Sequence, residues 1–99
     1  MRPIHTARLD KTRPALVLTR EQVRPYLTRV TVAPITSTIR GLSTEVQVGP
    51  TNGLDHAGVI SCDNIVTVPV GLLGPPVGFL LNEKETALTH AIHAAFDLD

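Results

Sequence analysis

Polar side chains that could bind a phosphate or move a proton stand beside three apolar segments of this 99-residue chain. Arg13 comes directly before Pro14 and the apolar run that ends at Leu18. Proline starts a strand well and holds the preceding residue in an extended conformation, so we expect the guanidinium at a fixed place. Its N–H groups form a fork that matches a phosphate, which makes Arg13 a candidate for stabilising phosphate charge.

Two further groups of polar residues follow apolar segments. The first group carries hydroxyls and comes after segment 30–35, and the second comes after residues 59–60 and adds a carboxylate and an amide. The two groups are Thr36, Ser37 and Thr38, and Ser61, Asp63 and Asn64. If the fold brings these strand ends to Arg13, they assemble a guanidinium, hydroxyls, a carboxylate and an amide.

This set contains no nucleophile with an attendant base, as a serine or cysteine hydrolase would need. It suits a substrate that carries its own nucleophile, as RNA does in its 2′-hydroxyl group. Each residue also has an ordinary structural alternative. These are an ion pair of Arg13 with Asp10 or Glu21, a backbone hydrogen bond at Thr36, and a turn at Asp63 and Asn64.

Strand patterns dominate the rest of the chain. Apolar or alternating segments predict strands at residues 4–9, 14–19, 30–35, 45–48, 59–62, 65–70 and 77–81. Turn signals separate them at Arg40-Gly41, 49–53 and 74–76. The near-continuous apolar run of segment 14–19 is typical of a central strand that is buried on both faces.

Two helices are expected as well. Segment 20–27 is short and contains Pro25, and a longer helix follows Asn82, which could cap it. The apolar stripe of this last helix is Leu88, Ile92, Ala95 and Phe96. Short strands followed by a terminal amphipathic helix predict one mainly β domain over residues 1–99, either a small, strongly bent barrel or a two-sheet sandwich.

Composition limits the possible functions. Residues 1–40 carry eight Lys or Arg and two Asp or Glu, whereas residues 41–99 carry one and seven. This asymmetry suggests an anionic partner such as nucleic acid, although two solvated faces that neutralise each other would give the same count. With three aromatic residues, base-stacking platforms are not expected.

Neither a metal site nor a membrane segment is expected. His5, His56, His90, His93 and Cys62 show no recognised zinc spacing, and Cys62 is the only cysteine. The first ten residues are charged and lack the apolar segment of a secretory signal, and no apolar run is long enough to span a bilayer. We therefore expect a soluble cytoplasmic protein.

The segments TRPALVLT, VTVAPITSTIRG, GVISCDNIVTV and VGFLLNEKETALTHAIHAAF together resemble the MazF/PemK (Kid) family of toxins, in the same order and over nearly the whole chain. The resemblance implies a homodimeric, SH3-like barrel with appended helices. It implies a toxin of a type II toxin–antitoxin pair that cleaves single-stranded RNA at short sequences without a metal. The 2′-hydroxyl would attack the adjacent phosphorus, leaving a 2′,3′-cyclic phosphate and a 5′-hydroxyl, and a cognate antitoxin would block the RNA groove.

Carried over residue by residue, the resemblance implies that Arg13 and Thr36 are catalytic and that Asp63 supports them. Ser61 stands where Kid has an arginine, and Asn64 where Kid has a glutamine. Around these residues we expect the RNA contacts. The contacting residues are Lys11, Ser37, Thr38, Arg40, Ser61 and Asn64.

Two alternatives remain open at this point. CcdB resembles this fold family and poisons DNA gyrase without being an enzyme, but it depends on a tryptophan, and this chain has none. A catalytically inactive relative that only binds the antitoxin would also share the fold. The presence of both Arg13 and Thr36 argues against that second alternative.

Overall fold

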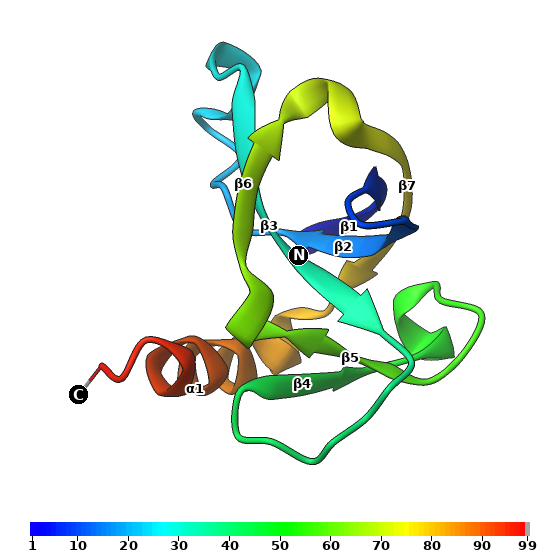
Figure 1. Ribbon diagram of the computed structural model, residues 1–99, viewed down its shortest axis with the longest axis vertical. Coiled ribbons are helices and arrows are strands. Elements are labelled where there is room, and N and C mark those ends of the chain that lie inside the picture. Colours follow the sequence, from blue (N-terminus) through cyan, green and yellow to red (C-terminus); the bar gives the residue numbers. More distant parts are fainter. Residues whose placement is uncertain (99) are drawn as a thin grey trace.

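Seven antiparallel strands form one strongly curled sheet that a single α-helix follows, in a computed structural model that describes residues 1–98 (Figure 1). The strands are β1 (Arg2–Arg8), β2 (Thr12–Val17), β3 (Arg29–Thr36), β4 (Glu45–Val48), β5 (Gly58–Ser61), β6 (Val66–Pro69) and β7 (Leu73–Leu80). The helix is α1 (Glu85–Ala95). Five 3-10 turns connect these elements. The expected mainly β fold, a strongly bent barrel with a C-terminal helix, is confirmed as a half-barrel.

The long strand β3 joins the two parts of the sheet. Its first half pairs with β6, from Arg29 opposite Pro69 to Val32 opposite Val66, and its end pairs with β5 at residues 35–36. Its other edge pairs with β2, and the sheet continues through β1 to β7. Because β3 changes partner along its length, its C-terminal end projects between β2 and the small β4–β5 hairpin (Figure 1).

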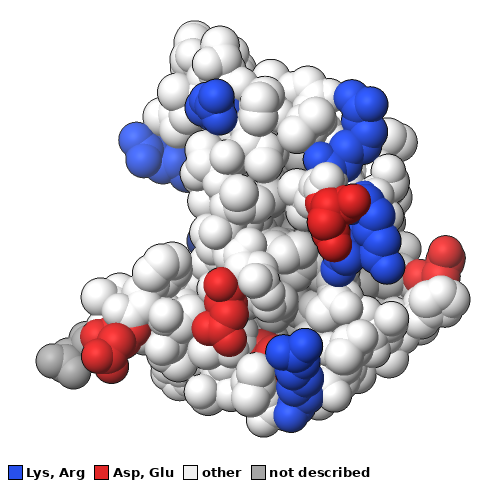
Figure 2. All heavy atoms as spheres, viewed as in Figure 1, with Lys and Arg blue, Asp and Glu red and all other residues white. Residues whose placement is uncertain are grey.

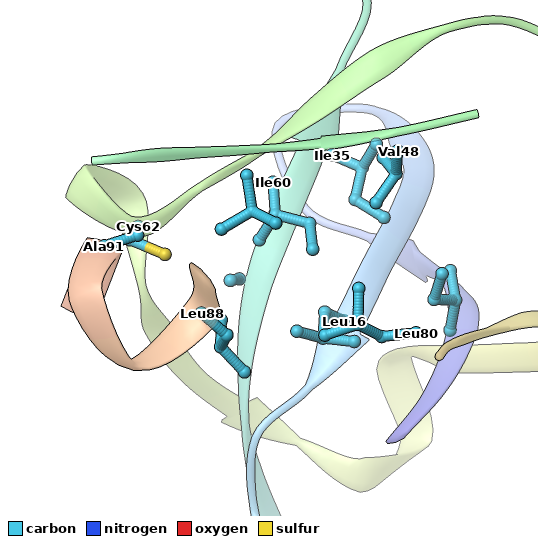
Figure 3. Packing of buried hydrophobic residues seen from close by; sticks show 11 residues of the cluster. Leu16, Ile35, Val48, Ile60, Cys62, Leu80, Leu88 and Ala91 are labelled. Carbon is cyan, nitrogen blue, oxygen red and sulfur yellow. The ribbon is translucent and has the colours of Figure 1, made fainter. Parts of the chain in front are cut away.

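The central strands are buried on both faces. Leu16 and Ile35 face one apolar cluster, which the helix closes with Leu88 and Ala91 (Figure 3). The neighbouring residues Ala15 and Val17 face a second cluster, which is smaller. Burial on both faces explains why the run after Pro14 is continuously apolar. It also makes β2 a rigid support for the residues at its start.

Several expected boundaries are wrong, and prolines explain two of them. Segment 20–27 forms only a 3-10 turn at Arg24–Tyr26, because Pro25 lacks the N–H that a longer helix needs. The expected turn at 74–76 lies inside β7, an edge strand whose pairing with β1 shifts register. Edge strands and bulges tolerate proline because a missing backbone donor there interrupts no ladder.

The expected cap and stripe of the last helix also need correction. Asn82 begins a 3-10 turn, and α1 starts at Glu85 with no side-chain cap at Lys84. The side chain of Phe96 is exposed rather than packed with Ile92 and Ala95.

No helix within residues 1–98 is long and apolar enough to cross a membrane.

Candidate active site

The β2–β3 pairing brings the start of β2 to the end of β3. Ala15 lies opposite Pro34, and extending this register by two residues places Arg13 opposite Thr36. Arg13 is itself inside β2, where it pairs with Ala7 of β1, so the expectation that it precedes the strand is wrong. Antiparallel pairing with β1 therefore fixes the backbone of Arg13 more firmly than Pro14 alone would.

The guanidinium of Arg13 is only partly satisfied within residues 1–98. Its Nη2 donates to Asp10 Oδ2 at 2.9 Å, which is one of the ordinary alternatives that the sequence suggests. Its Nε is buried and has no hydrogen-bond partner among the described residues. A buried N–H without an acceptor costs about 1–3 kcal/mol, so Arg13 is poised to bind an anion.

Arg13 also changes the acidity of Asp10. Desolvation, the largest single contribution, raises the pKa of Asp10. A backbone hydrogen bond at Lys11 and the charge of Arg13 lower the pKa and prevail. The Asp10 carboxylate thus stays ionised over a wider pH range and holds one edge of the guanidinium. From the sequence, Asp10 is expected only as an ordinary ion-pair partner of Arg13.

Two hollows meet at Arg13 and Thr36. The first, here called the Arg40 hollow, has a volume of about 350 Å³. Its lining includes Arg13, Thr36, Thr38, Arg40, Glu45, Ser61, Asp63 and Asn64. The second, the Lys11 hollow, has a volume of about 540 Å³, and its lining includes Lys11, Arg13, Thr36, Ser37, Asp55, His56 and Gly58. Every site residue expected from the sequence lines one or both hollows.

The wall of the Arg40 hollow that carries Arg40 is held by Glu45. Glu45 Oε1 accepts hydrogen bonds from the backbone N–H groups of Arg40, Gly41 and Leu42, at 3.2, 2.9 and 3.2 Å. Gly41 has φ +72°, which glycine adopts without strain and which turns three successive N–H groups toward one oxygen. This role is not visible in the sequence, because the alternating pattern of β4 predicts only a half-exposed strand.

The residues at and after the end of β5 also line the Arg40 hollow. Asp63 Oδ2 accepts a hydrogen bond from Thr44 Oγ1 at 2.6 Å, and Asn64 Nδ2 donates to Ser61 Oγ at 2.8 Å. Asp63 lies in a 3-10 turn, Cys62–Asn64, so the expected strand over 59–62 ends one residue early. Cys62 points into the core, where burial and the charge of Asp63 raise the pKa of its thiol to about 11.

The hydroxyl of Thr36 can still donate a hydrogen bond. Its Oγ1 accepts a hydrogen bond from the backbone N–H of Thr38 at 3.2 Å. The hydroxyl proton therefore remains available to donate to a substrate oxygen. Behind Thr36, a Cβ at Gly58 would lie 2.6 Å from the Thr36 carbonyl oxygen, so only glycine lets β5 approach this strand end.

Charge is unevenly spread over the surface. On the face shown in Figure 2, Lys and Arg atoms lie mostly over the upper half, and Asp and Glu atoms mostly over the lower half. Within residues 1–98, only the ion pair of Arg2 with Glu85 joins the basic and acidic halves of the sequence. Most of the opposite charges therefore remain separate rather than neutralising each other in pairs. No group of three potential metal ligands comes together among the described residues.

Comparison with known proteins agrees with this architecture. Residues 2–96 match the family described as PemK-like, MazF-like toxin of type II toxin-antitoxin system. The chain belongs to this family. Among curated members, endoribonuclease MazF3 of Mycobacterium tuberculosis is 63% identical to this MazF-like chain, over 100% of this chain and 96% of the relative.

Solved structures agree with the family assignment. The Mycobacterium tuberculosis toxin MazF-mt6 superimposes with a TM-score of 0.96 at 62% identity, covering 98% of both chains. A mycobacterial endoribonuclease in complex with its cognate antitoxin has a TM-score of 0.85, covering 98% of this chain and 93% of its own. At 22% identity, this second likeness shows that the MazF-like fold is shared.

Proposed function

We propose that this MazF-like toxin is an endoribonuclease that cleaves single-stranded RNA at specific sequences without a metal cofactor. The observation that carries the proposal is the half-satisfied guanidinium of Arg13, which lies where two hollows meet beside Thr36. A phosphate at this point would receive donors that the described residues leave unused. The family membership and the name of the 63% identical relative support the same activity.

The reaction assigns one role to each of three residues. The 2′-hydroxyl oxygen attacks the adjacent phosphorus while the bond from phosphorus to O5′ breaks. The leaving O5′ takes a proton from water, which gives a 2′,3′-cyclic phosphate and a 5′-hydroxyl. Arg13 stabilises the charge that builds on the phosphate oxygens, and the Thr36 hydroxyl donates to the same group. Asp63 supports them as the acceptor of the 2′-hydroxyl proton, because its Oδ1 accepts no hydrogen bond from the described residues.

RNA would pass through both hollows. Lys11 and Ser37 contact it in the Lys11 hollow, while Thr38, Arg40, Ser61 and Asn64 contact it in the Arg40 hollow. This division follows from the lining of each hollow. The scissile phosphate lies at Arg13 and Thr36, so the two sides of the cleaved bond occupy different hollows.

Cleavage of a pool of long RNAs in EDTA tests the proposal. We expect full activity and products that end in a 2′,3′-cyclic phosphate and a 5′-hydroxyl. A requirement for added Mg²⁺ together with 5′-phosphate ends would contradict the mechanism. Intact RNA together with stalled gyrase on DNA would instead support the gyrase-poison alternative.

We further propose a cytoplasmic homodimer that a cognate antitoxin inhibits. Large apolar side chains remain exposed on the single chain, among them Tyr26, Val70, Phe96 and Leu98. A second copy or an antitoxin would remove such surface from water. Light scattering after gel filtration should give twice the chain mass at micromolar concentration, whereas a monomer that still cleaves RNA would rule out an obligatory dimer.

A further inference from the structure

Glu45 is an unusual residue to find in a hollow that binds RNA. The Arg40 hollow carries two carboxylates, those of Glu45 and Asp63, beside the cations of Arg13 and Arg40. A carboxylate repels the phosphates of RNA but accepts hydrogen bonds from the amino groups of bases. A carboxylate in this hollow is therefore compatible with RNA where it faces a base rather than the backbone.

The two oxygens of Glu45 have different environments. Oε1 is committed to three backbone N–H groups of the loop that carries Arg40. Oε2 accepts no hydrogen bond from the described residues, and it is not among their buried polar atoms that lack a partner. Oε2 is therefore not fully buried, and it belongs to a side chain that the loop holds in a fixed orientation.

We propose that Glu45 is a specificity-determining residue that selects, in the Arg40 hollow, a nucleobase with an exocyclic amino group. This inference rests on the proposed ribonuclease function. Oε2 accepts the amino N–H of cytosine, adenine or guanine. Uracil has no exocyclic amino group: where cytosine carries the N4 amino group, uracil presents the O4 carbonyl, which the negative charge of Oε2 repels, and its one base donor, N3–H, lies at a different place on the edge. At the position that occupies this hollow, uracil is therefore rejected and an amino-bearing base is accepted.

The backbone N–H groups of residues 40–42 determine how a glutamine at position 45 would be oriented. They need an oxygen as acceptor, because the amide nitrogen of a glutamine is itself a donor and cannot accept their hydrogen bonds. In Glu45→Gln, the amide oxygen therefore takes the place of Oε1, and the NH₂ group takes the place of Oε2. The variant keeps the loop contacts and turns the base-facing acceptor into a donor, which favours uracil O4.

Sequencing of cleavage sites in long RNA pools tests this reversal. Wild-type protein should require an amino-bearing base at one fixed position beside the cut, and Glu45→Gln should accept uracil there. A hydrogen bond to a charged group corresponds to a change in preference of about tenfold to a hundredfold. Glu83→Gln is the matched control, since Glu83 is exposed and lies outside both hollows, and it should cut at wild-type sites.

A second measurement uses the wild-type protein and does not depend on how well the variant folds. In a short substrate cut by wild-type protein, the selected base is replaced by its analogue without the amino group, such as 2-pyrimidinone for cytosine. Cleavage by the wild-type protein should slow about tenfold or more, and cleavage by folded Glu45→Gln should change much less.

The outcomes separate this inference from the function on which it rests. Wild-type cleavage with no base preference at any position, or unchanged preference in folded Glu45→Gln, overturns the role of Glu45 and leaves the ribonuclease intact. Wild-type cleavage that is insensitive to removal of the amino group at every position also overturns it. Absence of RNA cleavage by the wild-type protein overturns the proposed function, and the inference with it.

Discussion

The two hollows share Arg13 and Thr36 but are organised differently. In the Arg40 hollow, Glu45, Asp63 and Asn64 are all tied to neighbouring groups by hydrogen bonds. In the Lys11 hollow, the side chains of Lys11, Asp55 and His56 make no hydrogen bond to another described residue. The first hollow is thus preorganised, and the second is free to adapt to its ligand. A preorganised surface can discriminate between bases, whereas free side chains suit phosphate contacts that carry no sequence information.

Removing the group that both hollows share should have the largest effect. Arg13→Ala loses the donors that stabilise the transition state, and we expect the cleavage rate to fall by about 10²–10³-fold at constant fold. Arg13→Lys should recover little, because an ammonium cannot make the forked contact. Thr36→Val should be nearly as damaging, since it keeps the shape and removes the hydroxyl.

Single-turnover cleavage, with circular dichroism as the folding control, measures these effects. If a folded Arg13→Ala protein cleaved at the wild-type rate, the catalytic assignment would be wrong for both hollows. If Thr36→Val still cleaved RNA at the wild-type rate, the Thr36 hydroxyl would have no catalytic role, and the role assigned to Arg13 would be unaffected.

A change behind Thr36 should disturb both hollows without touching a polar group. The added methyl in Gly58→Ala lies too close to the Thr36 carbonyl, and overpacking of this kind costs about 1–3 kcal/mol of unfolding free energy. Cleavage should fall as well, because Thr36 must shift. Gly49→Ala is the matched control: its Cβ meets Ala57 at an ordinary 3.6 Å. Urea unfolding measures the unfolding free energy of both variants. Equal values for the two would show that β5 can move away from Thr36 without loss of stability.

Each hollow contains one further cation, Arg40 in the first and Lys11 in the second, and replacing them compares how the two hollows bind RNA. Arg40→Gln and Lys11→Gln each remove one phosphate contact, so each should reduce the slope of log affinity against log salt by about 0.7. Neither should change which sequences are cut, because phosphate contacts position RNA without reading it. Filter binding from low to high salt measures the slopes. Altered cleavage sites in Lys11→Gln would mean that the Lys11 hollow also reads bases.

The smallest effect at neutral pH should come from the core beneath the Arg40 hollow. The folded state keeps the Cys62 thiol neutral to a pKa of about 11, against 9.0 for a free thiol. Between these values the unfolded chain loses a proton that the folded chain keeps, so the unfolding free energy falls as pH rises. The total loss is on the order of 2–3 kcal/mol, and none of it is present below pH 8.

Urea unfolding from pH 8 to 11 tests whether the unfolding free energy falls as pH rises. Cys62→Ala removes a buried group and should be less stable than wild type at pH 8. The gap between the two proteins should narrow as pH rises, because only wild type carries the thiol. A gap that stays constant would show that Cys62 ionises equally in both states.

Sequence alone determined the elements whose signals are local. The continuous apolar run after Pro14 identifies a central strand, since only burial on both faces favours apolar residues at every position. The glycines at 41 and 53 mark turns, and both adopt positive φ. The residues Arg13, Thr36 and Asp63 could be singled out because polar groups beside apolar strands are conspicuous, and the family resemblance connected them.

Tertiary structure decided what depends on pairing between distant segments. The extent of β7 through Pro75 and Pro76 follows from its place at the sheet edge, which no local pattern reveals. Glu45 anchors the Arg40 loop because Gly41 turns three N–H groups toward it, although the sequence shows only an alternating strand. The register between β2 and β3 sets Arg13 beside Thr36, and register is a property of two strands together rather than of either sequence.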